Sequence, residues 1–113
     1  MTVEKCIVVE GRADFLKIVP IFKEEVAIIC TRGTISEEAL IELVEPYEDC
    51  ELFTLFDADD SGGKLRKLMN RVYSEATHLY IPKTYIEVEK TPRKILANIL
   101  KAAKFEIHEQ YLV

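Results

Sequence analysis

The chain lacks the features that mark membrane, secreted and zinc-binding proteins. No apolar run approaches the roughly 20 residues that a membrane-spanning helix needs, and the amino terminus has neither the basic nor the apolar region of a signal peptide. Three cysteines, Cys6, Cys30 and Cys50, are odd in number and form no Cys-x-x-Cys pair, which argues against a disulfide framework or a zinc site. We therefore expect a cytoplasmic protein with free thiols and no membrane contact.

Basic charge is also scarce. The 15 Lys and Arg residues are outnumbered by 20 Asp and Glu residues, which gives a net charge of −5. A protein that binds nucleic acid through bulk electrostatics needs clustered basic residues, so any contact with nucleic acid must be local or bridged by a metal ion. The chain shows no linker, repeat or low-complexity segment, and its 113 residues suit one domain over residues 1–113.

Two apolar runs each end in carboxylates followed by glycine, at residues 6–11 and 52–63. Short continuous runs of β-branched and aromatic residues are typical of strands buried on both faces, as in a parallel sheet covered by helices. Several acids would then project from one edge of the sheet, where they repel one another and raise one another's pKa. A hard cation such as Mg²⁺ would neutralise them, so the pattern indicates a metal site.

Strands and helices alternate along the rest of the chain. Further strands are expected at 26–30 and 77–82, and a short closing strand at 105–113. Helices are expected at 12–18 and from a capping box at Thr34 and Glu37 to about Val44. A third helix is expected after Gly62 and Gly63, and a fourth after Thr91, with Pro92 at its first position. The fourth helix carries an apolar stripe of Ile95, Leu96, Ile99, Leu100 and Ala103.

Alternation of this kind predicts a Rossmann-like α/β fold, a three-layer α/β/α sandwich around a mainly parallel four-stranded sheet. The acids can share one cation only if the first and third strands are neighbours, which favours the strand order 2-1-3-4. All four glycines then follow the carboxyl ends of strands, where open α/β sheets bind ligands and where glycine allows the backbone to approach phosphate closely: Gly11, Gly33, Gly62 and Gly63.

Three known acidic motifs fit the second run incompletely. Residues 57–62 match half of an EF-hand loop, but its twelfth position is Leu68 and a strand precedes it, so a calcium hand is rejected. Haloacid-dehalogenase-type phosphatases have a similar strand-end aspartate, yet they need further aspartates and none follows Asp60. A phospho-accepting receiver domain would need an acidic pair after the first strand, where Glu10 is followed by Gly11, and a lysine after a fifth strand.

A fourth family fits both runs in order. The motif Glu-Gly-x-x-Asp at residues 10–14, followed by Asp-x-Asp at 57–59 and then Gly62, resembles the TOPRIM domain of topoisomerases, bacterial primases, certain nucleases and recombination proteins. Gly33 and Thr34 resemble the glycine turn of that family. Among its subfamilies the chain is most similar to the ribonuclease that matures 5S ribosomal RNA, through residues 80–83 and 88–92. Known relatives usually attach the domain to a module that binds DNA or RNA, and no such module is present in this sequence.

The resemblance implies roles for particular residues. Asp57 and Asp59 would bind Mg²⁺, which Mn²⁺ can replace, and Glu10 would be a general acid or base or a further metal ligand, so that the three form the catalytic group. Asp14 and Asp60 are candidates for an outer shell around the metal. Candidate contacts to phosphate or nucleic acid are Arg12, Gly33, Gly62, Lys64, Lys67, Arg71 and Lys83. The alternative is that these residues have no functional role, because acids in turns and basic residues on helix faces are commonly exposed only to solvent.

The implied function is Mg²⁺-dependent cleavage or transfer of phosphodiesters in RNA or DNA, with a partner protein that supplies affinity for the nucleic acid. The alternative is a non-catalytic TOPRIM module that binds metal or nucleic acid or docks onto a larger assembly. A phospho-accepting receiver domain is the third hypothesis.

Overall fold

The sheet has four parallel strands, as predicted. The computed structural model describes residues 3–113. The strands are β1 (Lys5–Val9), β2 (Ala27–Cys30), β3 (Glu51–Leu55) and β4 (Thr77–Leu79), in the order β2-β1-β3-β4. β1 is paired in parallel with β2 on one side and β3 on the other, so the carboxyl ends of the first and third strands lie side by side. The predicted fold class and strand order are confirmed.

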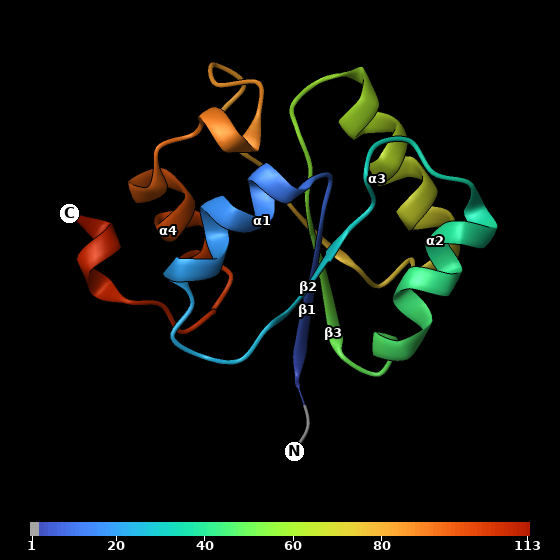
Figure 1. Cartoon of the computed structure of the whole chain (residues 1–113), viewed down its shortest axis with the longest axis horizontal. Helices are drawn as coiled ribbons and strands as arrows, with labels where there is room; N and C mark the ends of the chain where they lie inside the picture. Colours follow the sequence, from blue (N-terminus) through green and yellow to red (C-terminus); the bar gives the residue numbers. More distant parts are fainter. Residues whose placement is uncertain (1–2) are drawn as a thin grey trace.

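Helices cover both faces of the sheet (Figure 1). α1 (Arg12–Ile18) and α4 (Arg93–Ala102) lie on one face, and α2 (Glu37–Val44) and α3 (Asp60–Val72) lie on the other. Short 3-10 turns, η1 (Val19–Ile21), η2 (Glu45–Tyr47), η3 (Val88–Lys90) and η4 (Glu109–Leu112), connect or follow these elements. No helix of the described residues is long and apolar enough to cross a membrane.

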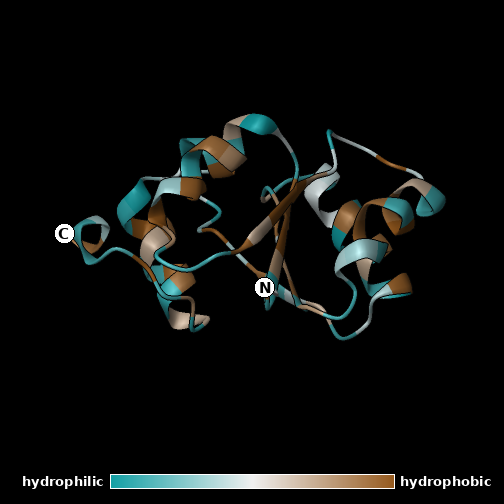
Figure 2. Ribbon diagram, turned by 60° about the horizontal axis from the view of Figure 1, so that its bottom comes forward, coloured by the Kyte–Doolittle hydropathy of each residue, from teal (hydrophilic) through white to brown (hydrophobic). Residues whose placement is uncertain are grey.

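The core forms two clusters, one on each face of the sheet. Along β1, Ile7 and Val9 belong to the cluster under α1 and α4, whereas Cys6 and Val8 belong to the cluster under α2 and α3. Side chains of a strand alternate between faces, and all four are fully buried. This explains the continuous apolar run in the sequence. The hydropathy colouring of Figure 2 shows the same concentration of apolar residues on the strands and on the inward sides of the helices.

Two helix starts differ from the sequence predictions. The N-cap of α2 is Ser36, whose hydroxyl accepts a hydrogen bond from Ala39 N at 3.1 Å, so the predicted Thr34 and Glu37 capping box is wrong. α3 begins at Asp60 and has Asp59 as its N-cap, which places Gly62 and Gly63 inside its first turn. In both cases several short polar residues compete for the cap, and pattern alone does not choose between them.

The end of the chain also differs. Residues 105–113 form no strand; Ile107 makes a single antiparallel bridge with Phe22, and η4 follows. Phe105 packs its ring against Phe53 at a centroid distance of 4.6 Å and against Phe22 at 5.2 Å. The segment therefore covers one face of the sheet and does not extend its edge.

Two further element boundaries differ from the predictions. β4 ends at Leu79, earlier than predicted. α4 has Pro92 at its N-cap, because the Thr91 hydroxyl donates to Glu87 O instead of capping the helix.

Candidate functional site

The carboxyl ends of β1 and β3 are joined by a hydrogen bond between the two predicted acidic motifs. Asp57 N donates to Glu10 Oε2 at 2.6 Å. Because β1 and β3 are neighbours, the side chain that follows one strand reaches the backbone that follows the other. The sequence placed Glu10 and Asp57 at the same sheet edge, and the structure brings them into direct contact.

Asp57 is also held from the opposite side. Its Oδ1 accepts a hydrogen bond from Val88 N at 2.8 Å, and Ala58 N donates to Ile86 O at 2.7 Å. The loop that leads into η3 therefore folds back over the end of β3. Ile86 adopts a left-handed backbone with φ of 64°, a conformation that costs free energy for a β-branched residue.

Asp59 and Gly62 fix the start of α3 beside this site. Asp59 Oδ1 accepts from Gly62 N at 2.8 Å, the usual bond of an aspartate N-cap. A Cβ at Gly62 would lie 2.0 Å from Asp57 O, so only glycine permits this approach of helix to strand. Arg66, one turn further, donates from Nη1 to Asp57 O at 3.3 Å and lies over the ring of Tyr80 at 5.2 Å.

Electrostatics at the site favour a bound cation. Burial, more than any other effect, raises the pKa of Glu10, and the hydrogen bond from Asp57 N lowers it in part. The charges of Asp57, Asp59 and Asp14 raise it further. Burial likewise raises the pKa of Asp57, the hydrogen bond from Val88 N opposes this rise, and the charge of Asp59 adds to it. A positive ion would relieve these costs.

Asp14 is the most buried acid of the site, with 6% of its surface exposed. Burial raises its pKa to about 6, and the charge of Asp57 contributes to the rise. Its Oδ2 accepts from Gly11 N at 3.1 Å. Asp14 is therefore bound to the turn that follows Glu10, and its charge contributes to the raised pKa of Glu10.

Glu10, Asp57 and Asp59, here called the acidic trio, offer donors of the kind that Mg²⁺ prefers. One oxygen of each carboxylate is bound to a backbone N–H, and the second has no hydrogen bond from the residues that the structure describes. Within residues 3–113, no three His, Cys, Asp or Glu side chains converge closely enough, as they lie, to hold a metal ion. Ligation of one ion by the trio thus requires side-chain rotation, and Mg²⁺ that keeps several waters needs only one or two direct carboxylates.

The predicted phosphate contacts are distributed over three parts of the molecule. Arg12 is the first residue of α1, and Gly33, with φ of 93°, ends the turn after β2. Lys64, Lys67 and Arg71 are exposed on α3, and Arg71 is paired with Glu37 at 3.5 Å. Lys83 is exposed in the turn after β4, and Asp60 is exposed at the start of α3. The roles of all these residues stay predictions.

Sequence reasoning missed Val88, Arg66 and Arg32. Val88 is a fully buried valine within a charged stretch, which is a weak sign that this stretch folds back onto the core. Arg66 lies on the same helix as the basic residues that were predicted, and no pattern distinguishes it. Arg32 N and Gly33 N both donate to Glu10 O, at 2.7 and 3.3 Å, so the turn after β2 is attached to the acidic edge.

The sequence and the fold are similar to those of known proteins. Residues 7–91 match the model of a family described as Toprim-like. An uncharacterized protein of Bacillus subtilis, YusF, is 42% identical over 109 residues, which cover 96% of this chain and 75% of that protein. The solved structure of a small TOPRIM domain protein from Bacillus stearothermophilus superimposes with a TM-score of 0.94 at 42% identity and covers 100% of this chain and 96% of its own.

Proposed function

This chain belongs to the Toprim-like family, and from that premise we propose that it binds Mg²⁺ at the acidic trio and cleaves or transfers phosphodiesters of nucleic acid. Family membership by itself supports a metal-binding module related to nucleic acids. The observation that carries the finer proposal is the bond between Glu10 Oε2 and Asp57 N, because it holds the two acidic strand ends together in spite of their repulsion.

Each residue of the trio has a separate task in this proposal. Asp57 and Asp59 are the residues that would hold the metal, since each has a carboxylate oxygen without a hydrogen bond from the described residues. Glu10, whose pKa is raised by its burial, is the candidate general acid or base. When bound, Mg²⁺ supplies charge neutralisation for the phosphate and lowers the pKa of a bound water. A partner protein supplies affinity for the nucleic acid, since the net charge of the chain is −5.

Thermal melts with and without Mg²⁺ test the metal site. Ligand stabilisation follows RT ln(1 + [L]/Kd), so Mg²⁺ at ten times its Kd should add about 1.4 kcal/mol to the wild type. Asp59→Asn removes the charge but keeps an N-cap for α3, so we expect the Mg²⁺ shift to fall while the fold persists. Asp49→Asn removes the charge of another exposed aspartate, before β3, and should leave the shift unchanged. Equal shifts in all three proteins would remove Asp59 from the metal site.

Incubation with structured RNA and single-stranded DNA in Mg²⁺ or Mn²⁺ tests the activity. We expect cleavage by the wild type, alone or with its partner, and loss of cleavage in Asp57→Asn. Cleavage that persists in the Asp57→Asn, Asp59→Asn double variant would assign the activity to another site or to a contaminant.

A non-catalytic docking module is the second candidate. It is favoured by the backbone hydrogen bonds of the trio, because each carboxylate also fixes a turn or a helix start. In that case Mg²⁺ would stabilise the fold without turnover on any substrate, and a protein of nucleic-acid metabolism would be recovered with the chain in pull-down experiments.

A further inference from the structure

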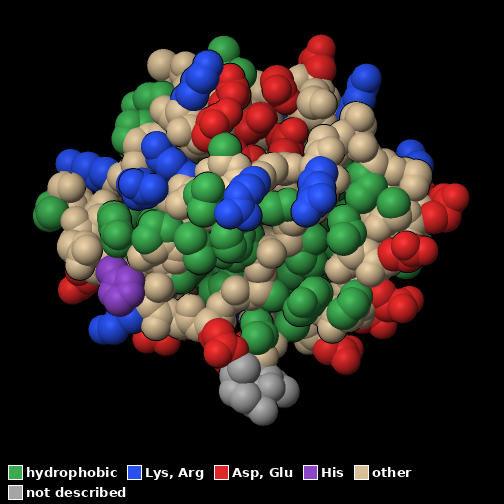
Figure 3. All heavy atoms as spheres, in the orientation of Figure 1, with side chains coloured by type: hydrophobic (Ala, Val, Ile, Leu, Met, Phe, Trp, Pro, Cys, Tyr) green, Lys and Arg blue, Asp and Glu red, His purple; other side chains and the backbone are tan. Residues whose placement is uncertain are grey.

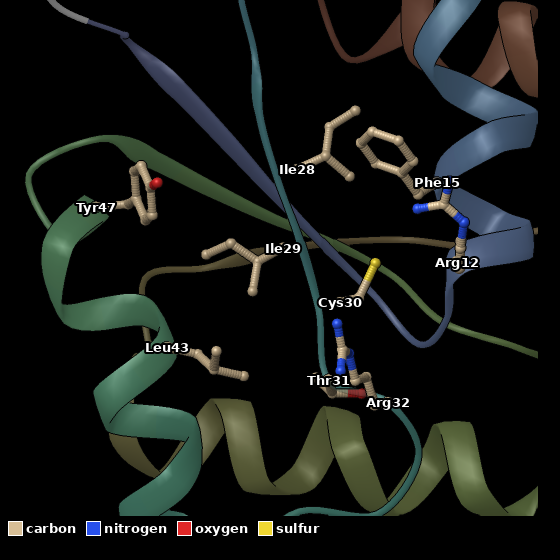
Figure 4. Close-up of a pocket in the computed structure, with 9 residues that line it drawn as sticks. All are labelled: Arg12, Phe15, Ile28, Ile29, Cys30, Thr31, Arg32, Leu43 and Tyr47. Carbon is tan, nitrogen blue, oxygen red and sulfur yellow. The ribbon is translucent and has the colours of Figure 1, made fainter.

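The free edge of β2 forms the floor of a groove that contains Arg12, one of the predicted phosphate contacts. β2 pairs with β1 on one side only, and a cavity of about 600 Å³ lies along it. Its walls come from α1 with Phe15 and from α2 and η2 with Leu43 and Tyr47 (Figure 4). We call this cavity the β2 groove. Its volume is in the range of sites for small organic ligands.

The groove is apolar along its length and basic at one end. Ile28 and Phe15 lie on one side of β2, and Ile29 lies on the other with Leu43 and Tyr47. Figure 3 shows hydrophobic side chains gathered across the middle of this face and a group of acidic side chains at the top. Basic side chains lie between the hydrophobic region and the acidic group. A ligand that complements this groove would carry both an apolar surface and a negative charge.

Two arginines supply the basic end. Arg12 from α1 and Arg32 from the end of β2 lie on either side of Cys30 in Figure 4. Neither guanidinium forms an ion pair or a hydrogen bond with residues 3–113. Burial raises the pKa of the Cys30 thiol, the charge of Asp14 adds to this, and the charges of Arg32 and Arg12 oppose it.

The backbone of Arg32 gives independent support. Arg32 has φ of 62°, a left-handed conformation that Gly or Asn adopts readily and that costs other residues about 1–2 kcal/mol. Strain of this kind persists where the surrounding structure fixes it, often at functional sites. Here Arg32 N donates to Glu10 O at 2.7 Å, which fixes the arginine next to the acidic trio.

We propose that Arg12 and Arg32 bind a phosphodiester of a single-stranded nucleic acid and that the adjoining base packs into the β2 groove against Phe15 and Ile28. The identity of the polymer rests on the proposed function. The strand would then reach the acidic trio from the side of β2 and not along the basic residues of α3. Stacking of bases on aromatic side chains next to paired arginines is a common way to hold single strands.

Binding of fluorescently labelled single-stranded RNA and DNA oligonucleotides, measured by anisotropy in EDTA, tests this placement. Arg32→Asn removes one charge and keeps a residue that accepts a left-handed backbone. Lys104→Asn is the matched control, since Lys104 is exposed, carries one charge and has φ of 71°. We expect Arg32→Asn to weaken binding about tenfold and to lower the salt slope by about one. Lys104→Asn should stay within twofold of the wild type.

Equal weakening in the two variants, or none in Arg32→Asn, would overturn the proposal. An oligonucleotide with abasic positions tests the groove itself, and its loss of affinity should disappear in Phe15→Ala. Because EDTA removes the metal, this binding does not require a loaded metal site: Asp57→Asn should abolish cleavage without weakening the binding. A dimer that Ile28→Lys dissociates, with oligonucleotide binding unaffected by Arg32→Asn, would assign the groove to a second copy of the chain instead.

Discussion

At the scale of single residues, Gly62 makes the sharpest demand on the fold. Because a Cβ there would lie 2.0 Å from the backbone oxygen of Asp57, Gly62→Ala must displace either α3 or the end of β3. We expect the free energy of unfolding to fall by about 2 kcal/mol or more, as in other overpacked sites. Denaturant titration measures it.

Gly63 provides the control for that change. It lies in the same helical turn, but a Cβ there meets no atom within 4 Å. Gly63→Ala should therefore raise the free energy of unfolding by about 0.5–1 kcal/mol through helix propensity. A similar loss in both variants would mean that the turn tolerates no substitution for reasons other than this close approach.

Asp14 gives a prediction of pH dependence. Its pKa is raised from the ordinary value of 3.8 to about 6, so the folded state binds the proton more tightly than the unfolded state. The corresponding stabilisation is complete below about pH 4 and is lost as the pH rises through 6. Asp14→Asn keeps an acceptor for Gly11 N and loses the charge. Without Mg²⁺ it should exceed the wild type in stability by about 1–3 kcal/mol at pH 8, and the difference should vanish near pH 4.

The pH dependence of the wild type alone does not isolate Asp14, because His78 also titrates in this pH range and has the opposite effect on stability. Its ring bonds to the Thr54 hydroxyl at 2.6 Å and to Asn70 Oδ1 at 2.8 Å, and burial lowers its pKa, with a further contribution from the charge of Arg66. Its contribution to stability is therefore present above pH 6.5 and lost at lower pH, the reverse of Asp14. Denaturant unfolding of the wild type and Asp14→Asn from pH 4 to 8 isolates the contribution of Asp14, because His78 is present in both proteins. A stability difference that does not change with pH would contradict the raised pKa of Asp14.

At the scale of elements, α4 shows how an apolar stripe divides between core and surface. Leu96 and Leu100 are fully buried, whereas Ile95 and Ile99 are partly exposed and line a shallow groove with Tyr80 and other residues that follow β4. We expect Leu100→Ala to cost about 2–5 kcal/mol. Ile99→Ala should cost clearly less, and thermal or denaturant unfolding of the two variants compares them. Equal costs would place both residues in the core.

The elements that could be predicted from sequence are those whose signal is local. Continuous apolar runs revealed β1 and β3, and the demand that Glu10 and Asp57 share one edge gave the strand order. The contact of Val88 N with Asp57 could not be predicted, because it depends on how a charged loop returns to the sheet. Residues 105–113 have the composition of a strand, but they do not pair with β2 or β4, the strands at the two edges of the sheet. Instead, the ring of Phe105 packs against Phe53 on the face of the sheet, and Ile107 makes a single bridge with Phe22.

At the scale of the whole molecule, the thiols report on global opening. The three cysteines are free in the structure, as predicted, and Cys6 is fully buried in the central strand with its pKa raised by burial to about 12. In a Cys30→Ser, Cys50→Ser variant, a thiol reagent should modify Cys6 only when the entire sheet opens. The labelling free energy should then equal that of global unfolding, measured by denaturant. A lower labelling free energy would mean that β1 opens locally.

The central position of β1 has a consequence for synthesis on the ribosome. β1 is the first strand to be made, yet it is buried between β2 and β3, and β3 ends at Leu55. At about 5–20 residues per second, the apolar segment Cys6–Val9 waits several seconds for its second neighbour. During that interval the nascent chain exposes four residues that are fully buried in the finished sheet, so chaperone binding should be strongest before residue 55 emerges.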